Sequence, residues 1–129
     1  MSDDAAFGLK RIGQIAVNVK DVARATAFYK DRLGMKFLFS APPNLAFFDC
    51  GGVRLMLGKA EKPEFDHPTS VLYYAVDDIQ KATAALRERG VAIESEPHRI
   101  AQLEKTDLWM AFCRDSEDNL LGIMSEVTR

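Results

Sequence analysis

The sequence repeats itself: the signals along its first half occur again, in the same order, along its second half. Asp21 and Gly34 bracket an amphipathic helix in the first half, as a cap and a stop signal. Asp78 and Gly90 bracket a second helix, and the tripeptide Ala-Thr-Ala occurs at the same point of both helices. An alternating apolar segment precedes each helix, and two strands joined by a turn end each half. A duplicated structural unit explains this order.

Each half therefore predicts the element order β-α-β-β-β. The expected strands are 12–19, 35–40, 45–50 and 53–57 in the first half, and 71–76, 91–94, 108–114 and 120–124 in the second. The expected fold class is α+β, with two βαβββ modules that form a cupped mixed β-sheet and carry their helices on its outer face. We expect one domain over residues 1–129, with one module at about 10–58, a polar loop at 59–69 and the other module at about 70–127. One module alone buries only a modest core, so the two should pack together and leave a concave ligand site.

Composition excludes several classes of protein. The net charge of −2 and the pI near 5.7 argue against nucleic-acid binding. No apolar run approaches the roughly 20 residues that cross a bilayer, so no membrane partner is expected. The acidic N-terminus predicts no signal peptide, and Cys50 and Cys113 form no CxxC pair. These features favour a cytoplasmic protein with reduced cysteines.

Two stretches resemble a known superfamily. Residues 27–36 (AFYKDRLGMK) are similar to the end of the first helix, and residues 111–119 (AFCRDSEDN) to the last hairpin turn, of the vicinal oxygen chelate superfamily. That superfamily includes glyoxalase I, bleomycin-resistance proteins and extradiol dioxygenases. Ser116 stands where the family usually has proline, and Asp118 where it has glycine. The resemblance implies paired βαβββ modules, a homodimer and a small-molecule ligand.

Metal-dependent members hold a divalent ion with four ligands, one on the first and one on the last strand of each module. Those positions fall on Gln14, Leu55, Val71 and Gly122, and only Gln14 has a side-chain oxygen. One amide oxygen cannot hold a divalent ion. We therefore expect no metal and no other cofactor.

Strand alternation predicts which side chains face the cup. The inward set is Gln14, Ala16, Phe47, Leu55, Val71, Tyr73, Met110, Phe112, Leu120 and Gly122. We expect the ligand to contact Gln14, Phe47, Leu55, Val71, Tyr73, Met110, Phe112 and Gly122, although any one of them could instead fill the core. Arg54 and Trp109 alternate to the other side. Such a lining suits an apolar or aromatic small molecule better than a polycation.

His98, at the start of the expected loop before residue 108, is the candidate general acid or base. Glu104 in the same loop could pair with it, while a solvated histidine is the alternative, and His67 is expected to be exposed. Three functions remain open: a metal-free small-molecule binder, a lyase, isomerase or dioxygenase of the superfamily with a non-standard site near His98, and a structural or regulatory protein that keeps only the fold.

Overall fold

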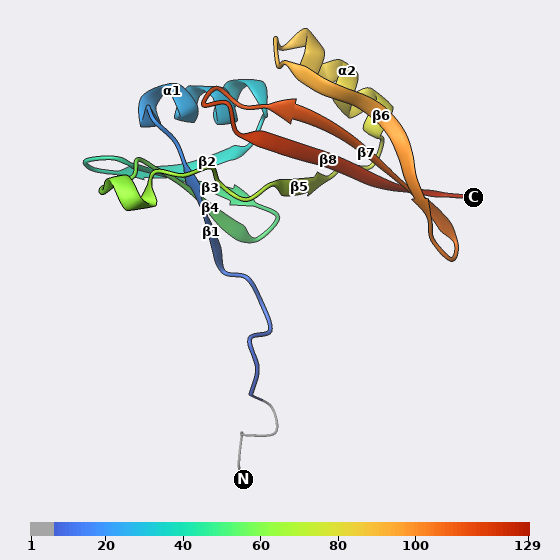
Figure 1. Cartoon of the computed structure of the whole chain (residues 1–129), viewed down its shortest axis with the longest axis horizontal. Coiled ribbons are helices and arrows are strands. Elements are labelled where there is room, and N and C mark those ends of the chain that lie inside the picture. Colours follow the sequence, from blue (N-terminus) through green and yellow to red (C-terminus); the bar gives the residue numbers. More distant parts are fainter. Residues whose placement is uncertain (1–6) are drawn as a thin grey trace.

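The computed structural model describes residues 7–129. The expectation that there is no signal peptide rests mainly on residues 1–6, which include Asp3 and Asp4 and lie outside the described part. The elements are β1 (Gln14–Asn18), α1 (Val22–Ala27), the π-helical turn η2 (Phe28–Arg32), β2 (Lys36–Ala41), β3 (Leu45–Cys50), β4 (Val53–Gly58), the 3-10 turn η3 (Pro63–Phe65), β5 (Leu72–Ala75), α2 (Ile79–Glu88), β6 (Ile93–Gln102), β7 (Thr106–Arg114) and β8 (Leu120–Thr128) (Figure 1).

Each half forms its own four-stranded mixed sheet, with the orders β1-β4-β3-β2 and β5-β8-β7-β6. In both sheets the first strand of the module lies parallel to its last strand, and the other pairs are antiparallel. The chain is thus an α+β protein of two βαβββ modules, as the repeat predicts. No strand pair joins the two sheets within residues 7–129, so the cupped sheet is not closed.

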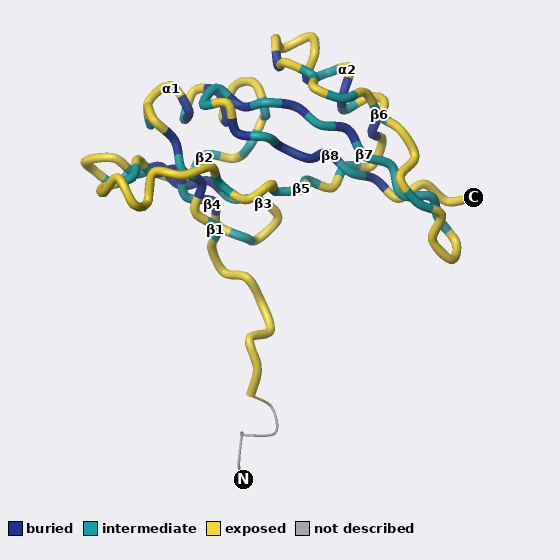
Figure 2. Tube along the Cα trace, viewed as in Figure 1, coloured by how far each residue is buried: buried dark blue, intermediate teal, exposed yellow. Residues whose placement is uncertain are grey.

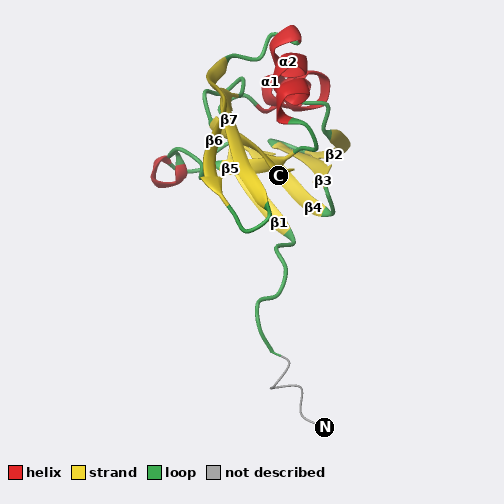
Figure 3. Cartoon of the chain, turned by 90° about the vertical axis from the view of Figure 1, so that its right-hand side faces the viewer, coloured by secondary structure: helices red, strands yellow, loops and turns green. Residues whose placement is uncertain are grey.

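Both helices begin and end where the sequence predicts. The Asp21 carboxylate accepts a hydrogen bond from the Arg24 amide, and Asp78 accepts from the amides of the first turn of α2. Gly34 and Gly90 follow the helices with φ of +68° and +82°, a conformation that favours glycine. The two helices lie on the same side of the sheets (Figures 1 and 3).

One hydrophobic core joins the two modules. Val17, Phe48 and Leu57 of the first sheet belong to the same buried cluster as Leu121 and Ile123 of the second. The buried stretches of Figure 2 run along the inner strands and the facing sides of the helices. Trp109 packs against this cluster, on the side opposite to the expected ligand site, and Cys113 lies within the cluster as a small apolar residue.

The turn between β7 and β8, the superfamily-like segment, connects the modules. Buried Asp115 accepts hydrogen bonds from Tyr29 Oη at 2.8 Å and from the amides of Glu117 and Asn119. Asn119 Nδ2 donates to the backbone oxygen of Asn18 at 3.0 Å. We call residues 115–119 with their contacts in the first module the joint.

One element differs from expectation. Strand β6 runs from Ile93 to Gln102, so the segment predicted as a long loop forms most of a strand. Because β6 is the edge strand of its sheet, Pro97 lacks an amide hydrogen at a place where none is needed. None of the described helices is long and apolar enough to cross a membrane.

Candidate ligand-binding face

Each sheet has one face turned away from the helices, which we call its open face. On the first sheet Gln14 lies beside Arg54 on β4, and Met56 lies beside Phe47 on β3. Paired residues point to the same side of a sheet. Gln14, Phe47, Arg54 and Met56 therefore share the open face, and Phe39 stacks on Phe47 with ring centroids 4.6 Å apart.

Leu55 lies on the opposite face, and its expected place in the cup is wrong. It is 2% exposed and belongs to the core cluster beneath the helices. The expected parity rests on the superfamily position assigned to Leu55, and Leu55, Met56 and Leu57 are all apolar, so β4 shows no alternation that would contradict it. The charged residue in the strand, Arg54, marks the side that faces solvent. Arg54 and Met56 are the site residues that the sequence analysis missed.

The open face of the second sheet has the expected residues. Tyr73 and Phe112 both pair with Gly122, so all three lie on one face, together with Met110. The rings of Tyr73 and Phe112 meet edge to face with centroids 5.9 Å apart. A Cβ at position 122 would overlap the Tyr73 ring, so the missing side chain makes room for it. Tyr73 is 47% exposed and Val71 is 38% exposed, which leaves an apolar surface open to a ligand.

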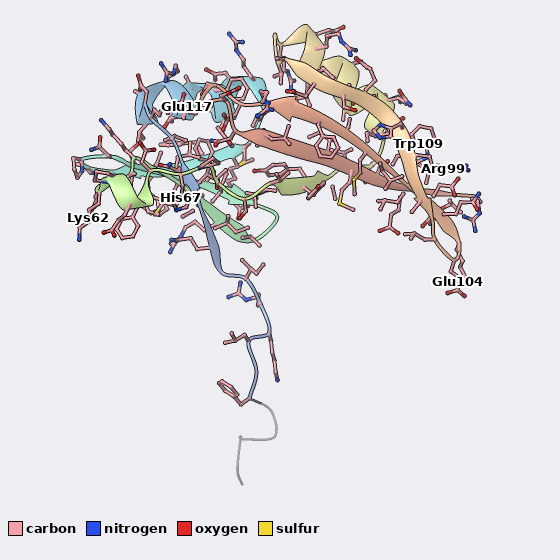
Figure 4. All side chains as sticks on the ribbon, viewed as in Figure 1. Lys62, His67, Arg99, Glu104, Trp109 and Glu117 are labelled. Carbon is pink, nitrogen blue, oxygen red and sulfur yellow. The ribbon has the colours of Figure 1, made fainter. Side chains whose placement is uncertain are left out.

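His98 lies on β6 rather than in a loop. Its strand partner is Met110, so it faces the same side as Phe112. Its Nδ1 lies 2.9 Å from the backbone oxygen of Glu96. Glu104 lies in the β6–β7 turn (Figure 4), and the structure does not bring its carboxylate to His98.

The open face of the first sheet extends into a hollow of about 440 Å³ beside the linker between the modules. Ala16 and Met56 form part of its floor, and Phe65 of η3 lines its wall. The linker is held by Asn18 Nδ2, which donates to the backbone oxygen of His67 at 2.9 Å. His67 itself is exposed, as expected.

Arg54 is fixed on this face by two contacts. Its Nε donates to Gln14 Oε1 at 2.7 Å, and its guanidinium carbon lies 5.3 Å from the centroid of the Phe47 ring. Gln14 Nε2 in turn points to Met56 Sδ at 3.7 Å. These contacts order Gln14, Arg54, Phe47 and Met56 as one group.

The residues at the metal positions of the superfamily do not fit a divalent ion. Gln14 Oε1 accepts its hydrogen bond from a guanidinium, whose positive charge would repel a cation at the same oxygen. Leu55, the expected position on β4, faces the core, and the β4 residues on the open face are the cation Arg54 and the thioether Met56. At Gly122 the Tyr73 ring fills the space of a side chain, so neither strand supplies an oxygen or nitrogen ligand. Within residues 7–129 no three His, Cys, Asp or Glu side chains gather into a possible metal site.

A second cavity, of about 390 Å³, lies between the modules, away from the open faces. Cys50 lines it, and burial, with a smaller effect of Asp49, raises the pKa of its thiol. Burial likewise raises the pKa of the Cys113 thiol to about 11. Both thiols are therefore protonated at neutral pH, and neither is poised to act as a nucleophile.

The glyoxalase/bleomycin resistance protein/dioxygenase superfamily model matches residues 11–123. The chain belongs to this superfamily. It is 28% identical over 123 residues to the uncharacterized protein YraH of Bacillus subtilis, covering 85% of this chain and 94% of that protein.

Solved structures show the same fold. A superfamily member from Sphaerobacter thermophilus matches with a TM-score of 0.76 and 20% identity, over 92% of this chain and 98% of the other. The lactoylglutathione lyase of Agrobacterium tumefaciens matches with a TM-score of 0.71 and 20% identity, over 90% and 93% of the two chains.

Proposed function

We propose that this superfamily member binds an apolar or aromatic small molecule on the open faces of its sheets, without a divalent metal. The observation that carries the proposal is the group of aromatic side chains left accessible there. Tyr73 and Phe39 are each 47% exposed, and each lies against a second ring, Phe112 or Phe47. Clustered aromatic surface of this kind is costly in water and typical of ligand sites.

The proposal includes a homodimer in the cytoplasm. The two open faces belong to separate sheets, and Phe7, Leu9 and Ile12 on the segment before β1 are more than 60% exposed. A second copy could cover this apolar segment and bring an open face of one chain opposite one of the other. Light scattering should give twice the mass of 14.4 kDa, and a monomer at micromolar concentration would contradict the dimer.

The binding proposal is tested with the neutral probe 1-naphthylmethanol in a thermal unfolding assay. A probe that binds only the folded protein adds about 1.4 kcal/mol of stability at tenfold excess over its Kd, so the melting temperature should rise. Tyr73→Ser should weaken the rise. Leu103→Ser, which changes an exposed apolar residue at the β6–β7 turn, should leave it unchanged. Equal effects of the two substitutions would place the binding elsewhere.

The enzyme alternative depends on His98. This histidine lies on the open face of the second sheet, with Met110 and Phe112 as neighbours, and could serve as a general acid or base for a bound molecule. Lyase turnover of a glutathione hemithioacetal, the reaction type suggested by the similar lyase fold, should then be lost in His98→Ala. Unchanged turnover in that variant would remove His98 from the mechanism.

A further inference from the structure

Arg54 brings a full positive charge to the open face of the first sheet, where its neighbours are the Phe47 ring and the Gln14 amide. Among residues 7–129, no carboxylate oxygen lies within 4.0 Å of its guanidinium, and its two terminal nitrogens make no hydrogen bond. Asp49 is its neighbour across β3 and β4, but Asp49 also pairs with Lys36 across β2 and β3. The three charges leave one unit of positive charge on this part of the face.

The contacts of Arg54 hold it ready for an anion. Only Nε is used, in the bond to Gln14, so the two terminal nitrogens remain as donors. A guanidinium edge with two parallel N–H groups matches the two oxygens of a carboxylate. The Phe47 ring, whose centroid lies 5.3 Å from the guanidinium carbon, also restricts the side chain, which lowers the entropy cost of fixing it on binding.

The surroundings define the rest of the ligand. Phe47 and Phe39 form a stacked pair beside Arg54, and Met56 leads from Arg54 into the hollow next to the linker. A planar ring on this surface would place an attached carboxylate at the guanidinium. Lys59 and Glu61 also line the hollow and have opposite charges, so its wall adds no net charge to that of Arg54.

We propose that Arg54 anchors the carboxylate of a small aromatic acid on the open face of the first sheet. The inference rests on the proposed function and narrows it from apolar or aromatic molecules to aromatic anions. Gln14 is then a positioning residue that holds Arg54 in place.

Three probes with one ring system separate the possibilities: 1-naphthoate, 1-naphthylmethanol and 1-naphthylmethylamine. Titration calorimetry on the full-length protein should give a Kd for the naphthoate that is about tenfold or more below that of the alcohol, as expected for a charge-assisted pair. The amine should bind more weakly than the alcohol. Arg54→Met should bring the Kd of the naphthoate within about twofold of the Kd of the alcohol measured on the same variant.

Arg32→Met is the matched control. Arg32 is also exposed and also lies over a phenylalanine ring, with 5.9 Å between its guanidinium carbon and the Phe28 centroid, but on the helix side. That variant should keep the preference for naphthoate. Gln14→Leu should reduce the preference without abolishing it, because the charge stays but its orientation is lost.

The outcomes distinguish this inference from the broader proposal. If the alcohol binds as tightly as the naphthoate, or if Arg54→Met keeps the preference, the anionic ligand is refuted while small-molecule binding stands. If none of the three probes binds, both proposals fail.

Discussion

Glu117 is the residue through which the second module completes the helix of the first. Its Oε1 accepts from the amides of Lys20 and Asp21 at 3.0 and 2.9 Å, and both oxygens accept from the Arg24 side chain (Figure 4). The hydrogen bonds from Arg24 are the main cause that lowers the pKa of Glu117 to about 2. A carboxylate with a lowered pKa stabilises the fold while it is ionised.

We predict that Glu117→Gln lowers the free energy of unfolding by about 1–2 kcal/mol at pH 7, a value reduced for the half-exposed Arg24. Because the folded pKa lies below the usual glutamate value, this contribution is present above about pH 4.5 and is lost as the pH falls toward 2. Urea unfolding at pH 7 and pH 3 should therefore show a smaller difference between wild type and variant at pH 3. Glu104→Gln, in the exposed β6–β7 turn, is the control. If both variants lose the same free energy of unfolding, the contacts of Glu117 in the joint do not stabilise the fold.

At the residue scale, the predicted faces depended on two superfamily positions, of which Gly122 was right and Leu55 was wrong. The faces of Tyr73 and Phe112 followed from the superfamily position assigned to Gly122, which the strand pairing places on the open face. Leu55 was assigned to the wrong face, because β4 is apolar on both faces and its sequence offers no check on that assignment. The hydrogen bond between Arg54 and Gln14 joins residues 40 positions apart, and no local sequence pattern predicts it.

The turn between β7 and β8 departs from the superfamily pattern at Asp118, and this departure strains its backbone. Asp118 stands at the usual glycine position and has a φ of +66°. An L side chain in this left-handed conformation is strained, although aspartate tolerates it better than most residues. Its own contact, with Arg114 at 4.0 Å, involves a side chain that is 90% exposed and contributes little.

We predict that Asp118→Gly raises the free energy of unfolding by about 0.5–1 kcal/mol, since glycine removes the strain. Asp118→Ala loses the same contact with Arg114 but keeps a Cβ, so it should be no more stable than wild type. Thermal unfolding of the three proteins measures the difference. A stabilisation shared by both variants would show that loss of the charge, rather than relief of the backbone, is responsible.

Element type and order followed from the sequence, except in β6. Ser95, Glu96 and Pro97 are typical of a loop, yet an edge strand accepts a charged residue and a proline because its outer side has no partner strand. Local propensity cannot tell an edge strand from a loop, because the difference lies in a neighbour that pairs from only one side. The candidate acid–base residue His98 therefore lies on the open face of a sheet and not in the loop that the sequence predicted.

The whole molecule has one core for two sheets, so the modules should unfold together. Phe48 lies in the first module and is fully buried, whereas Trp109, the single tryptophan, lies in the second. We predict that Phe48→Ala lowers the free energy of unfolding by about 3–5 kcal/mol through the cavity it creates.

Trp109 fluorescence reports the second module and far-ultraviolet circular dichroism reports both. In the Phe48→Ala variant the two signals should shift together to lower denaturant. A fluorescence transition that stays at the wild-type midpoint while part of the dichroism is lost earlier would show that the modules are independent.

The joint also sets an order of events during translation. Glu117 lies 97 residues after Lys20, whose amide it receives, so the first module leaves the ribosome with its helix uncapped by that carboxylate and its half of the core uncovered. At synthesis rates of roughly 5–20 residues per second, that interval lasts several seconds. We therefore expect the nascent first module to expose apolar surface that chaperones recognise, and a chain truncated at the linker to be more sensitive to proteolysis.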